Sequence, residues 1–154
     1  MTRPERRLSE EAAKELLLKG EVGVLSTAGA DGTPYGIPIN YVYAPEENIL
    51  FFHCATKGRK VNNLIENNKV SLAVVGSSKV IPERYTSAYE SVIVEGKASL
   101  ITDPDEKKRL LVLLCERFAP QALARRDEVI TKYLPATLMI RIDITSISGK
   151  HNHE

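Results

Sequence analysis

Apolar and polar residues alternate along several stretches of this chain, with the two-residue period of a half-buried strand. This pattern predicts strands over residues 21–28, 34–43, 49–53, 69–75, 89–101 and 136–147. The stretch 69–75 is apolar on both faces in places, so we expect it inside the sheet. Pro38 has no N–H to donate to a neighbouring strand, so the strand that contains it is expected at an edge or at a bulge.

Apolar residues that recur every three or four positions predict helices between these strands. The first helix begins after Ser9, a candidate N-cap, and ends at Gly20. A second helix follows Gly58 and ends near residue 67. A third begins around Pro104 and runs to residue 118, and a fourth covers 121–133. Residues 76–87 have the composition of a loop.

Strands dominate this order, turns join the early ones, and a helix pair separates the last two. We therefore predict an α+β fold with a mainly antiparallel sheet of six strands that closes into a small barrel with peripheral helices. Gly96 suits a bend at a barrel corner. Residues 1–154 are expected to form one domain, with short flexible ends at about 1–7 and 151–154.

Composition narrows the class of protein. Hydrophobic residues make up 43% and charged residues 27% of the 154 positions, as in ordinary soluble domains. The formal net charge of +1 gives no overall field that would recruit nucleic acid or a membrane surface. No apolar run has the length of a membrane span, and residues 1–7 do not look like a signal peptide. Cys54 and Cys115 lack metal-type spacing, so we expect a cytoplasmic protein.

The densest candidate chemistry follows the third predicted strand, which ends at His53. Between this strand and the next helix lie a hydroxyl, a glycine and three cations: Thr56, Lys57, Gly58, Arg59 and Lys60. The start of a helix offers free N–H groups and the positive end of its dipole, which favour phosphate. The alternative is that these cations are simply solvated. Walker and G-x-G-x-x-G motifs are absent, which excludes a Rossmann-type site.

Several segments, taken together in this order and spacing, point to a known family. They are Gly23-Val24-Leu25-Ser26-Thr27, residues 31–41 (DGTPYGIPINY), Phe52-His53-Cys54-Ala55, Gly58-Arg59-Lys60, residues 92–96 (VIVEG) and residues 147–150 (ISGK). The arrangement resembles the FMN-binding split β-barrel family that includes pyridoxamine 5′-phosphate oxidase. The 5-nitroimidazole-resistance flavoproteins are the branch that it resembles most.

The resemblance implies a homodimer with two FMN sites at its interface. Gly58, Arg59 and Lys60 match the element that binds the FMN phosphate, with Thr56 and Lys57 beside it. The second strand would pass the flavin and Ser91 would approach the ring edge, which adds the candidates Ile37, Pro38, Ile39, Asn40, Tyr41, Val42 and Ser91. The oxidase branch has basic residues where Ile37 and Val42 stand. Its C-terminal motif is absent and the chain has no Trp, so pyridoxamine phosphate oxidation is not expected.

His53 supports three interpretations. It is a structural residue bonded to a backbone carbonyl, a proton donor beside flavin or substrate, or a haem ligand as in related split-barrel proteins. In the nitroimidazole-resistance branch a His stands at this place. His151 and His153 are expected on a disordered surface, where two residues would hold a metal only weakly, and we predict no metal site.

The first function hypothesis is an FMN-dependent oxidoreductase that reduces a small aromatic or nitro compound, with His53 as the catalytic residue. The alternative is a flavin- or haem-binding protein without turnover, a carrier or sensor. A dimer that kept the fold and lost its cofactor is a third possibility. Another flavin or a deazaflavin in place of FMN is also open.

Overall fold

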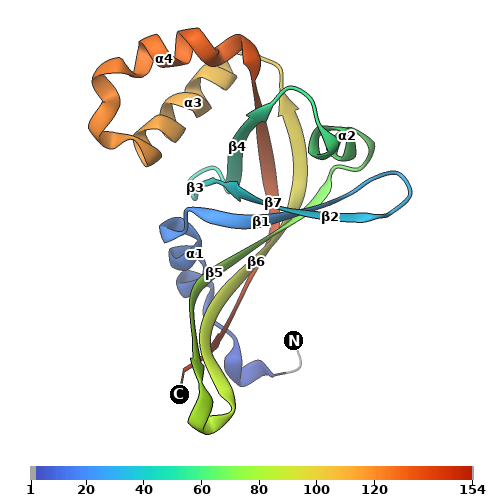
Figure 1. Ribbon diagram of the computed structural model, residues 1–154, viewed down its shortest axis with the longest axis vertical. Helices are drawn as coiled ribbons and strands as arrows, with labels where there is room; N and C mark the ends of the chain where they lie inside the picture. Colours follow the sequence, from blue (N-terminus) through green and yellow to red (C-terminus); the bar gives the residue numbers. More distant parts are fainter. Residues whose placement is uncertain (1–2, 154) are drawn as a thin grey trace.

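The computed structural model describes residues 3–153, and within them seven strands form one sheet (Figure 1). The strand order is β2-β1-β5-β6-β7-β4-β3, and each neighbouring pair is antiparallel. The strands are β1 (Val22–Ala28), β2 (Pro34–Asn40), β3 (Val42–Ala44), β4 (Ile49–Ala55), β5 (Lys69–Ile81), β6 (Thr86–Ile101) and β7 (Thr137–Asn152).

Four α-helices and four short 3₁₀ turns accompany the sheet within residues 3–153. The helices are α1 (Glu10–Lys19), α2 (Arg59–Glu66), α3 (Pro104–Phe118) and α4 (Arg126–Tyr133), and the turns are η1 (Pro4–Arg6), η2 (Pro82–Arg84), η3 (Pro120–Arg125) and η4 (Leu134–Ala136). Helices α3 and α4 lie at one end, and the β5–β6 hairpin extends as an arm at the other (Figure 1). None of the helices in this part of the chain is long and apolar enough to cross a bilayer.

The first and third predicted helix starts are confirmed by their caps. The Ser9 hydroxyl accepts a hydrogen bond from the N–H of Ala12 at 3.1 Å, and Asp103 accepts one from Glu106 at 2.9 Å. Each cap satisfies one of the N–H groups that a helix leaves unpaired at its start. Short polar residues before an apolar period therefore locate these helices from sequence alone. The fourth predicted helix, 121–133, starts too early, because residues up to Arg125 form the 3₁₀ turn η3 and α4 begins at Arg126.

Two hydrophobic cores lie on opposite sides of β4. Leu50 and Phe52 belong to the first core, which is enclosed by the sheet together with α1 and α2. Ile49 and Phe51 belong to the second core, which α3 and α4 cover. Successive side chains of a strand point to opposite faces, so one apolar run supplies both cores.

The predicted α+β antiparallel architecture is confirmed, but the strand count of six is wrong. The predicted strand 34–43 is divided at Tyr41 into β2 and β3. The N–H of Tyr41 donates to the carbonyl of Glu21 at 3.2 Å, and its hydroxyl donates to the carbonyl of Leu17 at 2.7 Å. These bonds draw Tyr41 out of the ladder and into the first core, where it is buried.

The predicted loop at 76–87 is also wrong over most of its length. Strand β5 continues to Ile81 and β6 begins at Thr86, and the two are paired along this arm. The arm is largely exposed on both faces, so its sequence lacks the alternation that a buried face imposes. Strand β7 likewise runs past residue 147 to Asn152, because its polar end pairs with β6.

Two positional predictions are confirmed. Strand β2, which contains Pro38, is an edge strand, and β5 lies inside the sheet. At Gly96 the register between β6 and β7 shifts, and a Cβ there would come within 2.6 Å of the carbonyl oxygen of Asp143. Only glycine allows this close approach of two backbones.

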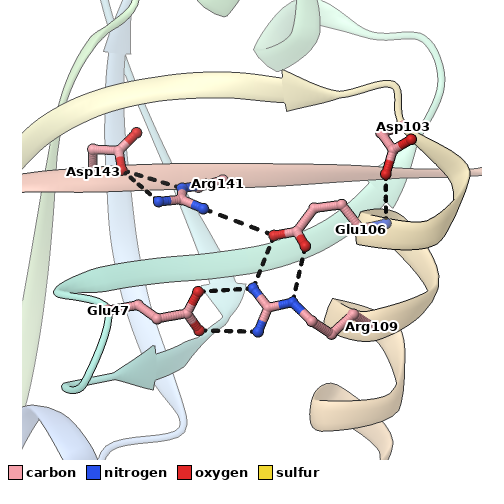
Figure 2. Close-up of polar contacts among 6 residues, drawn as sticks. All are labelled: Glu47, Asp103, Glu106, Arg109, Arg141 and Asp143. Atoms are coloured by element: carbon pink, nitrogen blue, oxygen red, sulfur yellow. Dashed lines mark hydrogen bonds and ion pairs between the residues drawn. The ribbon is translucent and has the colours of Figure 1, made fainter.

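A network of charged side chains holds α3 against the sheet (Figure 2). Arg109 on α3 donates to both carboxylate oxygens of Glu47 at 2.8 and 3.0 Å, and its Nε donates to Glu106 at 2.9 Å. Arg141 on β7 lies 3.7 Å from Glu106 and 3.0 Å from Asp143. Hydrogen bonds from Arg109 lower the pKa of Glu106. The network therefore joins the β3–β4 turn, α3 and β7.

We expect Arg109→Ala to lower the free energy of unfolding by about 1 kcal/mol, because it removes the bidentate pair with Glu47 and the hydrogen bonds to Glu106. Arg125→Ala, which removes a largely exposed pair with Glu128, should change it by less than about 0.5 kcal/mol. Urea unfolding measures both. The Arg109 effect should shrink as the pH falls through the lowered pKa of Glu106, since protonation removes the stabilised charge. Equal effects of the two substitutions would contradict a holding role for the network.

Candidate functional site

The turn from β4 into α2 forms an open helix start. Gly58 stands at the N-cap with a φ of 138°, a conformation that favours glycine, and no side chain caps the helix. The first helical hydrogen bond runs from the N–H of Asn62 to the carbonyl of Gly58. A Cβ on Gly58 would meet nothing within 4 Å. The N–H groups of the first turn are thus accessible to an anion.

Two cations of this turn rest on aromatic rings. The guanidinium carbon of Arg59 lies 4.4 Å from the ring centroid of Tyr35, and Lys60 Nζ lies 5.3 Å from that of Phe52. Within residues 3–153 neither cation forms a salt bridge with a carboxylate. The rings orient the positive charges without neutralising them. The predicted residues Thr56 and Lys57 complete the turn and are exposed.

Helix α2 is held in place by one buried and one exposed polar contact. Asn63 Nδ2 donates to the hydroxyl of Thr27 on β1 at 3.0 Å, and both residues are buried. Farther along α2, Glu66 accepts a hydrogen bond from the N–H of Ala30 at 2.8 Å. A cavity of about 470 Å³ lies between α2 and the β1–β2 turn, with Arg59 and Asp31 among its lining residues.

Sequence reasoning missed Tyr35 and Asn63, which position the candidate phosphate site. The helical period of Val61, Leu64 and Ile65 does not include Asn63, so the sequence gives no signal that this residue is buried. No sequence signal marks Tyr35 either. Its contact with Arg59 depends on how the β1–β2 hairpin and α2 meet.

Three of the predicted residues lie on the outer face of the sheet. Pro38 is paired with Val24, Asn40 with Val22, and Ser91 on β6 with Val75 of β5. Asn40 Nδ2 donates to the carbonyl of Glu21 at 3.3 Å. Asn40 pairs with Val22, at the end of β1 that is far from α2. Ala28, at the end of β1 nearest α2, is six residues away, which corresponds to about 20 Å along the strand. One chain therefore does not bring Asn40 or Ser91 to the helix start.

The other predicted residues of the second strand face the protein interior. Ile39 and Tyr41 are buried, while Ile37 and Val42 pack at the margins of the two cores. Burial raises the pKa of Tyr41 to about 12. Because β2 is an edge strand, it could contact a ligand through its free backbone groups rather than through these side chains.

His53 lies on β4, beside Met139 of β7, and shares a face with Phe51. Its side chain lines an apolar groove beneath α3 and α4, away from the first core. Partial burial lowers the pKa of His53, and the positive charge of Lys60 lowers it further. The imidazole is therefore neutral at neutral pH. The strand thus links the groove at His53 to the cation-rich turn that follows it.

Comparison with known proteins places the chain in a family. The sequence model of the family described as pyridoxamine 5′-phosphate oxidase matches residues 9–151. No curated protein sequence gives a significant match.

Solved structures share the fold at low sequence identity. A proposed 5-nitroimidazole antibiotic resistance protein from Bacteroides thetaiotaomicron is 19% identical, with a TM-score of 0.77 over 94% of this chain and 86% of that one. The FAD and haem binding protein from Mycobacterium smegmatis is 23% identical, with a TM-score of 0.79 over 97% and 74%. The flavocytochrome Anf3 from Azotobacter vinelandii is 20% identical, with a TM-score of 0.78 over 95% and 68%. These likenesses confirm the predicted split-barrel fold.

We expect Lys60→Met to raise the pKa of His53, because it removes a positive charge that disfavours the imidazolium. The pKa should nevertheless stay below the usual range, since burial is the larger cause. An NMR titration of the His53 ring protons measures this. Lys57→Met in the same turn serves as the control and should leave the pKa of His53 unchanged. An unchanged pKa in Lys60→Met would contradict the proximity of the two residues.

Proposed function

The chain belongs to the pyridoxamine 5′-phosphate oxidase family, and we propose that it is a flavoprotein that holds FMN with its phosphate on the start of α2. The observation that carries this proposal is the uncapped helix start, where the side chains of Arg59 and Lys60 lie over aromatic rings. Hydrogen bonds from Thr33 lower the pKa of nearby Asp31 and the charge of Arg59 lowers it further, but in the described part of the chain Asp31 and Arg59 form no salt bridge. Backbone N–H groups and a guanidinium fork are the donors that a phosphate requires. The residues present therefore fit the phosphate end of FMN.

We further propose that the protein is an oxidoreductase for a small aromatic or nitro compound. A bound flavin would supply the electron chemistry. Arg59 and Lys60 would hold the phosphate, and the ring N–H of His53 would donate a hydrogen bond to the substrate. The lowered pKa of His53 keeps this imidazole neutral, so it donates without adding a charge. A structural relative whose name refers to 5-nitroimidazole resistance supports this substrate class.

The second candidate is a flavin- or haem-binding protein without turnover. Structural relatives described as a flavocytochrome and as an FAD and haem binding protein favour it. A histidine at the edge of an apolar groove is also compatible with a haem ligand. The visible spectrum separates the two, because oxidised flavin and haem absorb differently.

We expect the purified protein to be yellow and to release about one FMN per chain on heating. Arg59→Ala should weaken FMN binding at least tenfold, since it removes the bidentate phosphate contact, and Arg59→Lys should weaken it less. Arg125→Ala, at the turn between α3 and α4, is the matched control and should retain FMN. Titration of the apoprotein with FMN, followed by flavin fluorescence, measures the affinities. Full retention of FMN by Arg59→Ala would overturn the assignment, and release of FAD would correct the cofactor.

A homodimer is the third part of the proposal. The outer face of the sheet carries four apolar side chains that are each at least 40% exposed: Val22, Val24, Val75 and Ile93. The candidates Pro38, Asn40 and Ser91 lie on the same face. Exposed apolar groups in such a cluster are typical of an interaction surface. In one chain Pro38, Asn40 and Ser91 lie far from the start of α2. A second chain packed on this face would bring the start of its own α2 close to these residues.

We expect the protein to sediment as a dimer of the 17.1 kDa chain. Val24→Lys should shift it toward the monomer, because a charge would be buried at the interface. Leu123→Lys places a charge on an exposed leucine at the turn between the last two helices, and this control should stay dimeric. Analytical ultracentrifugation over a range of concentrations distinguishes the outcomes. A dimeric Val24→Lys would exclude this face as the interface.

A further inference from the structure

An apolar groove of about 280 Å³ lies between β4 and the α3–α4 pair, and we call it the α3–α4 groove. His53 and Thr137, from adjacent strands, form its floor. Its walls are Leu111 and Leu114 from α3 and Ile130 and Tyr133 from α4. The groove runs from buried Ile130 to Tyr133, which is 54% exposed, so it is open to solvent at one end.

The groove exists because the second core ends at His53. Along β4, Ile49 and Phe51 point into this core and are fully buried. The next side chain on the same face is His53, a polar residue that α3 and α4 cover only in part. The apolar side chains of α3 and α4 extend past Phe51, the last large apolar residue on this face of β4. Beyond Phe51 no large apolar side chain of β4 fills the space beneath the two helices.

The groove contains few groups that can recognise a ligand's polar atoms. Thr137 already donates its hydroxyl proton to the carbonyl of Tyr133 at 2.8 Å. Burial raises the pKa of the Cys115 thiol, which keeps that group neutral. The ring of His53 remains as the hydrogen-bonding group on the floor, and it is also neutral for the reasons given above.

Charge is absent from the lining of the groove. The nine residues that line it include no Lys, Arg, Asp or Glu. Several cations lie next to lining residues without lining the groove themselves. Lys107 donates to the carbonyl of Leu134 at 2.6 Å, and Lys132 lies 5.2 Å from the Tyr133 ring. The charges of Lys60 and Arg126 act on His53 and Cys115. An anionic or phosphorylated ligand would lose its hydration without gaining the paired donors that it needs.

We propose that the α3–α4 groove is the substrate site and that it takes an uncharged molecule of one or two aromatic rings whose polar substituent bonds to His53. The volume lies just below the roughly 300–1,000 Å³ of sites for drug-sized ligands, so it suits a small ring system. Leucine and isoleucine walls and the Tyr133 ring provide apolar and aromatic contacts. The role of the groove as a substrate site rests on the proposed flavoprotein function. Because no charged side chain lines it, the groove would also reject pyridoxamine phosphate.

Two isosteric probes test the preference for a neutral ligand: indole-3-carboxamide and indole-3-carboxylate. We expect the full-length protein to bind the carboxamide at least tenfold more tightly than the carboxylate. Titrations followed by ¹H–¹⁵N NMR give both affinities and locate the shifted amides on β4, α3 and α4. Equal affinity for the two probes, no binding of the carboxamide, or shifts confined to another part of the molecule would overturn the proposal.

Leu114→Phe should fill the groove and weaken carboxamide binding at least tenfold. Leu113→Phe is the matched control, because Leu113, the residue before Leu114 in α3, lines a separate surface hollow with Lys108 and Glu116. It should bind as the wild type does. Val129→Trp, on the partly exposed rim, provides a second block if Leu114→Phe fails to fold. Wild-type affinity in a folded blocking variant would overturn the assignment.

Flavin content measured on the same samples separates this proposal from the flavoprotein assignment. A flavin-loaded protein that does not bind the carboxamide overturns the groove alone. Suppose instead that the protein contains no flavin, binds the carboxamide, and no longer binds it when Leu114 is replaced by Phe. This result would support the groove as a ligand site and would overturn its role in flavin chemistry.

Discussion

Double burial of β4 is the constraint on which the rest of the structure depends. Its side chains fill one core on one face and a second core on the other, so the barrel and the α3–α4 layer cannot form independently of it. The strand is held between β3 and β7 by backbone pairing. Where its apolar run stops, the next residues are His53 and then the cation-rich turn into α2. The end of a core-forming element is therefore also where the candidate chemistry begins.

Polar contacts then fix the elements that the two cores leave free to shift. The network around Arg109 joins α3 to the β3–β4 turn and to β7, while Asn63 and Glu66 bind α2 to β1 and the turn that follows it. One set anchors α3, which forms a wall of the α3–α4 groove, and the other anchors α2, which carries Arg59. Both candidate binding regions are thus positioned by contacts that themselves bind no ligand.

The candidate residues fall into groups that play different parts. The turn at 56–60 offers donors for an anion, His53 faces the groove, and Pro38, Asn40 and Ser91 lie on the outer sheet face beside exposed valines. Ile39 and Tyr41 support the first core. A single chain does not bring these groups together, which is why the proposed flavin site and the proposed dimer belong to one hypothesis.

The sequence by itself determined the helix starts at Ser9 and Asp103, the edge position of the strand with Pro38, and the cation-rich turn, because each depends on local chemistry. It did not determine the β5–β6 arm, where pairing continues without a buried face to impose alternation. Nor did it reveal the break at Tyr41, which follows from bonds to residues about twenty positions away. The ring of Tyr35 under Arg59 and the groove at His53 were likewise decided by tertiary structure, since each requires elements far apart in the chain to meet.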